Sequence, residues 1–103
     1  MAGPRTLVHS PWFDRARARL GGAEAMDQIL GRELFRISLY ADLVPVVPEH
    51  DPLRVYRTAP FLRDDGQLVR LWIYFTLRPD QAVELLHIEA IEEDMGAGGV
   101  AHS

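Results

Sequence analysis

The 103-residue sequence has no cysteine and no lysine. Without cysteine, the chain has no disulfide, no thiolate metal site and no thiol nucleophile, which fits a protein of a reducing cytosol. It also has no glycine-rich phosphate loop, no nucleophile motif and no histidine spacing typical of a metal site. No apolar run is long enough for a signal peptide or a membrane span. We therefore expect a cytoplasmic globular protein without membrane association, cofactor or metal.

Positive charge is scarce in most of the chain. All eleven basic residues are arginine, and the formal net charge is −4. Residues 1–40 carry six arginines against four acidic residues, whereas residues 41–103 carry five arginines against eleven acidic residues. Nucleic-acid binders concentrate positive charge because phosphate contacts dominate their affinity. This sequence does so weakly, and only in its first half.

The length and the hydrophobic content of 48 % predict one domain with a proper core. We place this domain at residues 1–94. The remainder, residues 95–103, reads "MGAGGVAHS" and is predicted to be a flexible C-terminal tail.

Two helices are predicted in the first half. Ser10 and Pro11 form an N-cap and a first helical position, so that a short helix spans residues 12–20 and ends at Gly21-Gly22. A longer helix is predicted for residues 23–41, where apolar residues recur at spacings of three and four.

Four strands complete the expected fold. They span residues 5–9, 53–58, 69–77 and 82–90; a proline-rich connection at 42–52 and a loop at 59–68 join the others. The order β-α-α-β-β-β predicts an α+β fold, with two helices packed on one face of a small, mainly antiparallel four-stranded sheet. The strand at 69–77 is apolar on both faces and should be central.

The stretch "RLWIYFT" has unusual chemistry for a central strand. Period-two alternation puts Arg70, Trp72 and Tyr74 on the sheet face opposite the helices. In the strand at 53–58 the same pattern predicts Leu53 and Val55 toward the helices and Arg54, Tyr56 and Thr58 on the open face. Such a surface suits base stacking or partner docking.

Ordinary packing is the alternative explanation. If "RPDQ" (78–81) is a tight turn that pairs Leu77 with Ala82, Trp72 faces His87 as a packing pair. Arg70 then faces Glu89 as an ion pair. His87 could serve in acid–base chemistry or be structural. The acidic run Glu89, Glu92, Glu93 and Asp94 is interpreted as a solvated strand exit.

The strands "LRVYRT", "VRLWIYFTL" and "AVELLHIEA", in this element order, resemble the RelE/ParE superfamily of type II toxin–antitoxin toxins, from about Arg5 to Glu93. The resemblance implies a bacterial toxin neutralised by a cognate antitoxin. RelE-like members are metal-independent, ribosome-dependent mRNA endonucleases, whereas ParE-like members poison DNA gyrase. A non-catalytic interaction module that has lost toxicity is the alternative, and the acidic strand exit favours it. The oligomeric state, monomer or homodimer, stays open.

The resemblance also implies candidate site residues. In a nuclease, the proposed catalytic set is Arg54, Arg70, Tyr74 and His87, which would bind phosphate and move protons. Tyr56, Arg57 and Trp72 would bind the ligand. In a gyrase poison, the basic helical surface would instead bind the partner, and it consists of Arg15, Arg19, Arg32 and Arg36. The alternative is that these arginines are ordinary solvated helix charge.

Overall fold

The computed structural model describes residues 3–20, 24–63 and 65–93. Its elements are β1 (Leu7–His9), α1 (Pro11–Arg19), α2 (Glu24–Tyr40), the short 3-10 helix η1 (Ala41–Leu43), β2 (Arg54–Arg57), β3 (Phe61–Leu62), β4 (Leu68–Leu77) and β5 (Val83–Glu92). The predicted α+β fold and element order are confirmed, with β3 added inside the predicted loop at 59–68. The predicted helix end at Gly21-Gly22 and the tail at 95–103 lie outside the described residues.

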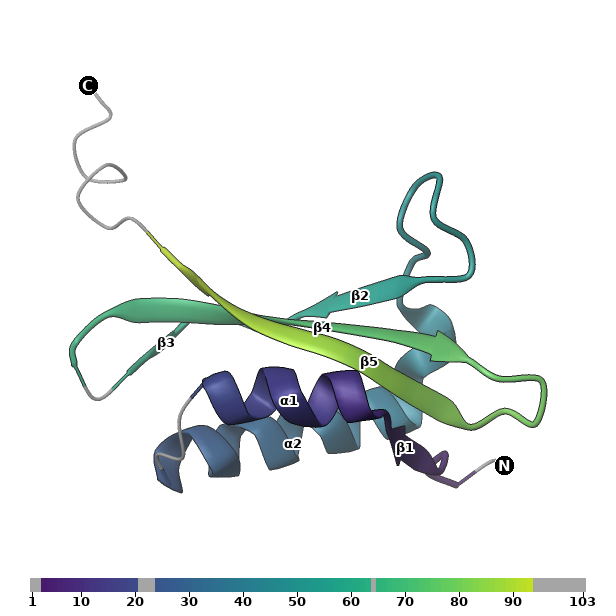
Figure 1. Cartoon of the computed structure of the whole chain (residues 1–103), viewed down its shortest axis with the longest axis horizontal. Coiled ribbons are helices and arrows are strands. Elements are labelled where there is room, and N and C mark those ends of the chain that lie inside the picture. The colour runs from purple at the N-terminus through teal and green to yellow at the C-terminus, as the bar shows by residue number, and fades with distance from the viewer. Residues whose placement is uncertain (1–2, 21–23, 64, 94–103) are drawn as a thin grey trace.

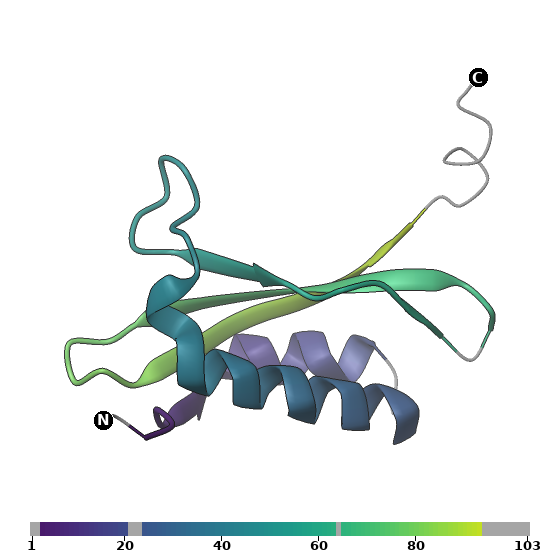
Figure 2. The same cartoon turned by 180° about the vertical axis from the view of Figure 1, so that it is seen from behind.

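The helices form one layer and the sheet forms the other (Figure 1). The strand order is β1-β5-β4-β2, and β3 pairs with β4. The pairs around β4 are antiparallel, whereas β1 runs parallel to β5, so the sheet is mixed. Both helices lie under the same face of the sheet (Figures 1 and 2). The loop between η1 and β2 rises on the opposite side, which we call the open face.

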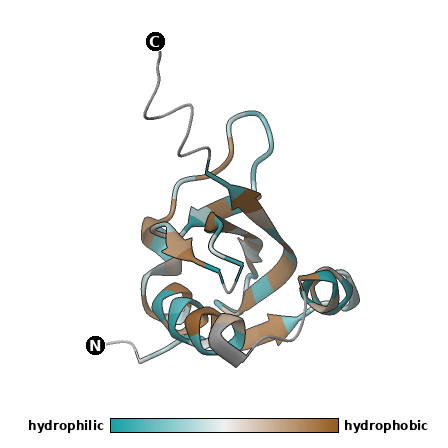
Figure 3. Ribbon diagram, turned by 90° about the vertical axis from the view of Figure 1, so that its left-hand side faces the viewer, coloured by the Kyte–Doolittle hydropathy of each residue, from teal (hydrophilic) through white to brown (hydrophobic). Residues whose placement is uncertain are grey.

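The hydrophobic core lies between the two layers. Along β4, buried and partly buried residues alternate, and Leu71, Ile73 and Phe75 are fully buried. They pack against apolar helix residues that include Phe13, Leu30 and Ile37. Figure 3 views the layers end-on and shows hydrophilic and hydrophobic segments alternating along the strands. The alternation predicted for β4 is therefore confirmed, because one set of its side chains faces the helices.

The start of α1 follows the predicted capping signal. The Ser10 hydroxyl accepts a hydrogen bond from the Phe13 backbone N–H at 3.1 Å, and Pro11 opens the helix. This bond satisfies one of the N–H groups that a helix start leaves without an intrahelical partner. The cap also directs Phe13 into the core, where it is fully buried.

The turn between β4 and β5 is one residue longer than predicted. Leu77 pairs with Val83, not with Ala82. The Arg78 N–H donates to the Ala82 carbonyl at 2.8 Å, and Gln81 adopts a left-handed conformation with φ of 72°. A non-glycine residue adopts a left-handed conformation only at an energetic cost. Glutamine at position 81 therefore does not indicate the longer turn. The predicted register was therefore wrong by one residue at the turn.

A bulge in β5 shifts the register a second time. Leu85 pairs with Phe75, but the next pair is His87 with Tyr74, so that Leu86 is the extra residue. Beyond the bulge, Trp72 pairs with Glu89 and Arg70 with Ile91. The predicted pairs Trp72–His87 and Arg70–Glu89 are therefore wrong. A bulge of this kind changes which face the following residues occupy.

The core predicts a contrast between two leucines. Leu71→Ala should lower the free energy of unfolding by about 3 kcal/mol, because Leu71 is fully buried and truncation leaves a cavity. Leu62→Ala is the matched control, since Leu62 is 65 % exposed, and it should change that energy by less than about 0.5 kcal/mol. Urea denaturation followed by circular dichroism measures both. Equal losses would contradict the assignment of Leu71 to the core.

Candidate functional site

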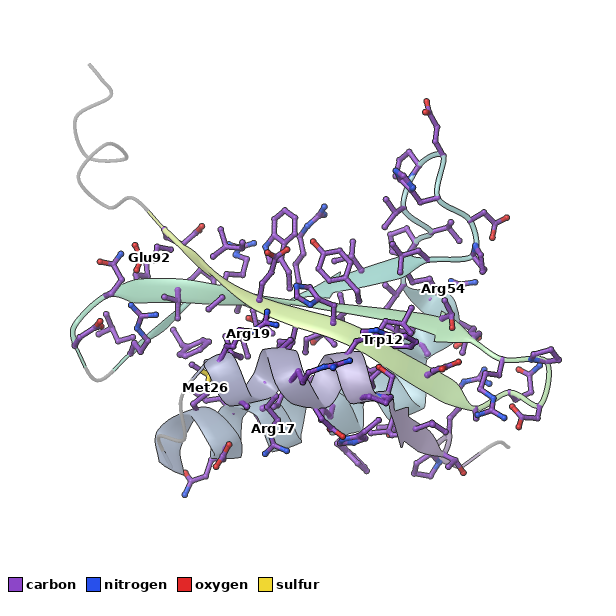
Figure 4. The ribbon with its side chains drawn as sticks, in the orientation of Figure 1. Trp12, Arg17, Arg19, Met26, Arg54 and Glu92 are labelled. Carbon is purple, nitrogen blue, oxygen red and sulfur yellow. The ribbon has the colours of Figure 1, made fainter. Side chains whose placement is uncertain are left out.

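Five side chains of different chemistry meet on the open face. Three strands supply them, and we call them the open-face cluster: Arg57 of β2, Trp72 and Tyr74 of β4, and His87 and Glu89 of β5. The register brings them together, because Arg57 and Glu89 both pair with Trp72, and His87 pairs with Tyr74. Side chains on this face stand away from the helices (Figure 4).

Arg57 and Trp72 form a stacked pair. The guanidinium carbon of Arg57 lies 4.4 Å from the centre of the Trp72 ring. Arginine over tryptophan gains from the ring quadrupole and holds the cation at a fixed height above the sheet. No ion pair engages Arg57 within the described parts of the chain. Its charge therefore remains available to an anionic ligand.

Tyr74 links the carboxylate and the imidazole of the cluster. Its hydroxyl donates to Glu89 Oε2 at 2.6 Å, and its ring centre lies 5.6 Å from that of His87. Partial burial raises the pKa of Tyr74 to about 12, with a further contribution from the hydrogen bond to Glu89 and a small opposing effect of the Arg57 charge. Tyr74 therefore stays protonated at neutral pH, and its hydroxyl orients the Glu89 side chain through the hydrogen bond.

Arg70 lies on the same face, beyond Trp72. Its guanidinium is 3.5 Å from Glu93, and its Nε and the Trp72 Nε1 are buried without a hydrogen-bond partner in the described structure. Glu93 belongs to the acidic run that was interpreted as a solvated strand exit. Its carboxylate instead pairs with Arg70 and offsets the arginine's charge. Arg70 is therefore less available to a ligand than Arg57.

Two site residues predicted for the open face lie on the opposite face of the sheet, toward the helices. Arg54 and Tyr56 pair with Phe75 and Ile73, whose side chains are buried, so they point toward the helices. The prediction for β2 was therefore reversed: Val55 and Arg57 take the open face. Thr58, also predicted there, is 3 % exposed, and its hydroxyl accepts a hydrogen bond from the Leu71 N–H at 3.0 Å.

The displaced residues hold β2 to the helical layer. The Tyr56 hydroxyl donates to Glu33 Oε1 at 2.7 Å, and burial together with this bond raises the pKa of Tyr56. Glu33 is 4 % exposed and also lies near the guanidinium groups of Arg32 and Arg36. Arg54 donates to the Val44 carbonyl just after η1. A buried carboxylate needs partners, and Tyr56 supplies one to Glu33. Arg54 joins β2 to the segment after η1.

The helical arginines predicted as a partner surface lie on both helices, Arg15 and Arg19 on α1 and Arg32 and Arg36 on α2. Arg15 and Arg19 are exposed, one turn apart. Arg19 lines a groove of about 390 Å³ together with His87 and Glu89. Arg17 instead binds Asp27 of α2 at 3.2 Å. The structure thus brings Arg19, but not Arg17, next to the open-face cluster.

Glu89 was not predicted as a site residue. It was interpreted as part of the solvated strand exit. The signal that could have identified it is its spacing of two from His87, since such residues share a face of a strand. Only the strand register shows that this face also carries Tyr74.

Within the described residues, no three histidine or acidic side chains gather as a metal ion requires. None of the helices found there combines the length and apolarity needed to cross a membrane.

The open-face cluster has the groups of acid–base chemistry: a carboxylate, an imidazole, a phenol and a guanidinium. No protein-family model, curated protein or solved structure matches the chain.

The Tyr74–Glu89 bond predicts a pH effect on stability. The pKa of Tyr74 is raised from 10.0 to about 12 in the folded protein. Its contribution to the free energy of unfolding is therefore fully present below pH 10.0 and is lost as the pH rises through about 12. Tyr74→Phe should remove this contribution. Urea denaturation at pH 9 and at pH 11.5 should show a smaller loss of stability in the variant than in the natural chain.

The matched control for that comparison is Tyr40→Phe, because Tyr40 is 54 % exposed. This variant should lose stability with rising pH as the natural chain does. If Tyr74→Phe follows the same course, the hydroxyl of Tyr74 is not held by Glu89 in solution.

Proposed function

We propose that this chain is the toxin of a bacterial type II toxin–antitoxin pair of the RelE/ParE kind, acting in the cytoplasm as a metal-independent mRNA endoribonuclease on the ribosome. One observation carries the proposal: His87 and Glu89 share the open face with Tyr74 and with the stacked pair Arg57–Trp72. Proton donor, proton acceptor, cation and stacking surface are the parts that RNA cleavage without a metal requires.

Each group has a role in the reaction. The Glu89 carboxylate takes the proton from a ribose 2′-hydroxyl, and the 2′-oxygen attacks the adjacent phosphorus. The bond from phosphorus to the 5′-oxygen breaks, and the His87 imidazolium protonates this leaving oxygen. The products are a 2′,3′-cyclic phosphate and a 5′-hydroxyl. Arg57 stabilises the charge of the phosphorane, and Tyr74 is a positioning residue that holds Glu89.

The stacked pair supports a single-stranded substrate. An aromatic ring and a guanidinium plane on an open sheet can stack against unpaired bases, whereas bases within a duplex are already stacked. The chain itself is acidic, with a net charge of −4, so electrostatic attraction alone gives weak RNA binding. A translating ribosome would supply the mRNA in a fixed position. An antitoxin that covers the open face would then block both stacking and catalysis.

A second candidate is a non-catalytic binding protein of the same fold, either a gyrase poison or a module without toxicity. The observation that favours it is the ion pair of Arg70 with Glu93 at 3.5 Å, which neutralises a cation expected to bind phosphate. Such a protein would use the open face or the helical arginines for docking alone. Its effect on cells would not depend on His87 or Glu89 as proton-transfer groups.

The nuclease proposal predicts a specific loss of activity. The chain is induced alone in a bacterial host, and incorporation of labelled amino acids and of thymidine is followed together with primer extension on an abundant mRNA. We expect protein synthesis to stop first and new mRNA ends to appear. With purified ribosomes, His87→Ala and Glu89→Gln should each reduce the cleavage rate by about 100-fold or more.

The controls are His50→Ala and Glu84→Gln. His50 lies in the exposed loop before β2, and Glu84 precedes the bulge of β5. Both variants should cleave as the natural chain does. An early stop in DNA synthesis would support the gyrase poison, and unimpaired growth would support the module without toxicity. Cleavage that survives both site variants would refute the assigned roles.

A further inference from the structure

The outer edge of β5 has a partner over only part of its length. On that side, β1 (Leu7–His9) pairs with residues 83–85 of β5. The last backbone hydrogen bond along this edge comes from Ser10, whose N–H donates to the Leu85 carbonyl at 3.1 Å. From residue 86 to residue 92 no described strand pairs with this edge. The chain turns at Ser10 into α1, which runs beneath β5 (Figure 1).

A groove therefore lies between α1 and the free part of β5. Its volume is about 390 Å³, and its walls include Ala16 and Arg19 of α1, Leu20 directly after that helix, and residues 87–90 of β5. Two of these β5 residues are His87 and Glu89. The groove thus leads from the helix to the proposed reaction site, over the edge of the sheet.

One flank of α1 carries three exposed side chains in a row that ends at Arg19, which lines this groove. Trp12, Arg15 and Arg19 follow one another at spacings of three and four, which places them in a row on a helix. Trp12 is 61 % exposed. Figure 4 shows Trp12 and Arg19 on the side of α1 nearer the sheet and Arg17 on the opposite side.

The chemistry of this row favours a polyanion. Arg15 and Arg19 form no ion pair within the described residues, unlike Arg17 and Arg63, which bind Asp27 and Glu92. Four residues of helix rise by about 6 Å, a step similar to that between successive phosphates of an extended strand. Trp12 offers a flat exposed ring one turn away. Cations at regular steps with an aromatic ring are typical of single-strand binding.

We propose that Trp12, Arg15 and Arg19 form a track for single-stranded RNA that continues from the open-face cluster over the edge of β5. This inference rests on the proposed function, since the track holds nucleotides that flank the cleaved phosphate. Arg15 and Arg19 bind two successive phosphates, and Trp12 stacks on a base without reading its identity. The substrate class is therefore an unpaired strand longer than the cluster alone can hold.

The test uses binding without cleavage. A fluorescein-labelled twelve-nucleotide 2′-O-methyl oligoribonucleotide, which lacks the attacking hydroxyl, is titrated with the full chain at several salt concentrations. Arg15→Ala/Arg19→Ala should weaken binding and reduce the slope of log affinity against log salt by about 1.4, because two phosphate contacts are lost. Trp12→Ala should weaken binding to all base sequences alike and leave the slope unchanged.

The matched control is Arg17→Ala/Arg78→Ala. These arginines lie outside the row and pair only with the exposed carboxylates of Asp27 and Asp80, and their removal changes the net charge equally. This control should leave both affinity and slope close to those of the natural chain. Circular dichroism confirms that all variants fold.

Several outcomes would overturn the track. Equal losses in the two double variants would mean that only net charge matters. An unchanged slope in Arg15→Ala/Arg19→Ala, or binding of an acidic peptide in place of the oligonucleotide, would assign the groove to another ligand. The proposed function is tested separately: cleavage that depends on His87 but not on Arg15 and Arg19 would remove the track and leave the nuclease. Binding that depends on the track in a chain without cleavage would remove the nuclease alone.

Discussion

The bulge at Leu86 is the constraint on which the open face depends. In a regular strand, Leu85, His87 and Glu89 would share one face. Leu85 and Ile88 are both buried, so the extra residue between them is necessary to place His87 and Glu89 on the opposite side. Without it, an imidazole and a carboxylate would enter an apolar core, at a cost of several kcal/mol. The same residue therefore protects the core and assembles the cluster.

Structure and chemistry are divided between the two faces of β2. Arg54 and Tyr56 fasten the strand to η1 and to the buried Glu33, whereas Arg57 turns outward and stacks on Trp72. The anchoring contacts fix the height and direction of Arg57 relative to β4. A rigid support of this kind is what a reactive or binding group needs, because small displacements weaken its contacts. The segment α2–η1 thus supports the open face through β2.

Both helices and every strand except β3 could be predicted from the sequence to within a few residues, because periodicity and the Ser10-Pro11 cap are local signals. The faces of β4 were also predictable, since its alternation is complete. The partners of its residues were not. They depend on Gln81, which extends the turn, and on Leu86, which bulges, and neither has a distinctive sequence signal. The reversed face of β2 has a similar cause, because Val55 is small and Tyr56 finds Glu33 only through tertiary packing.

The most direct test of this account is the pairing of β4 with β5 in solution. Nuclear Overhauser contacts between aromatic ring protons, measured on the full chain, report it without any substitution. The structure predicts contacts of the His87 ring with the Tyr74 ring, whose centre is 5.6 Å away. Contacts of the His87 ring with the Trp72 ring in their place would show that β4 and β5 form a regular hairpin without the bulge. They would separate the imidazole from the Tyr74–Glu89 pair and contradict the assembled site.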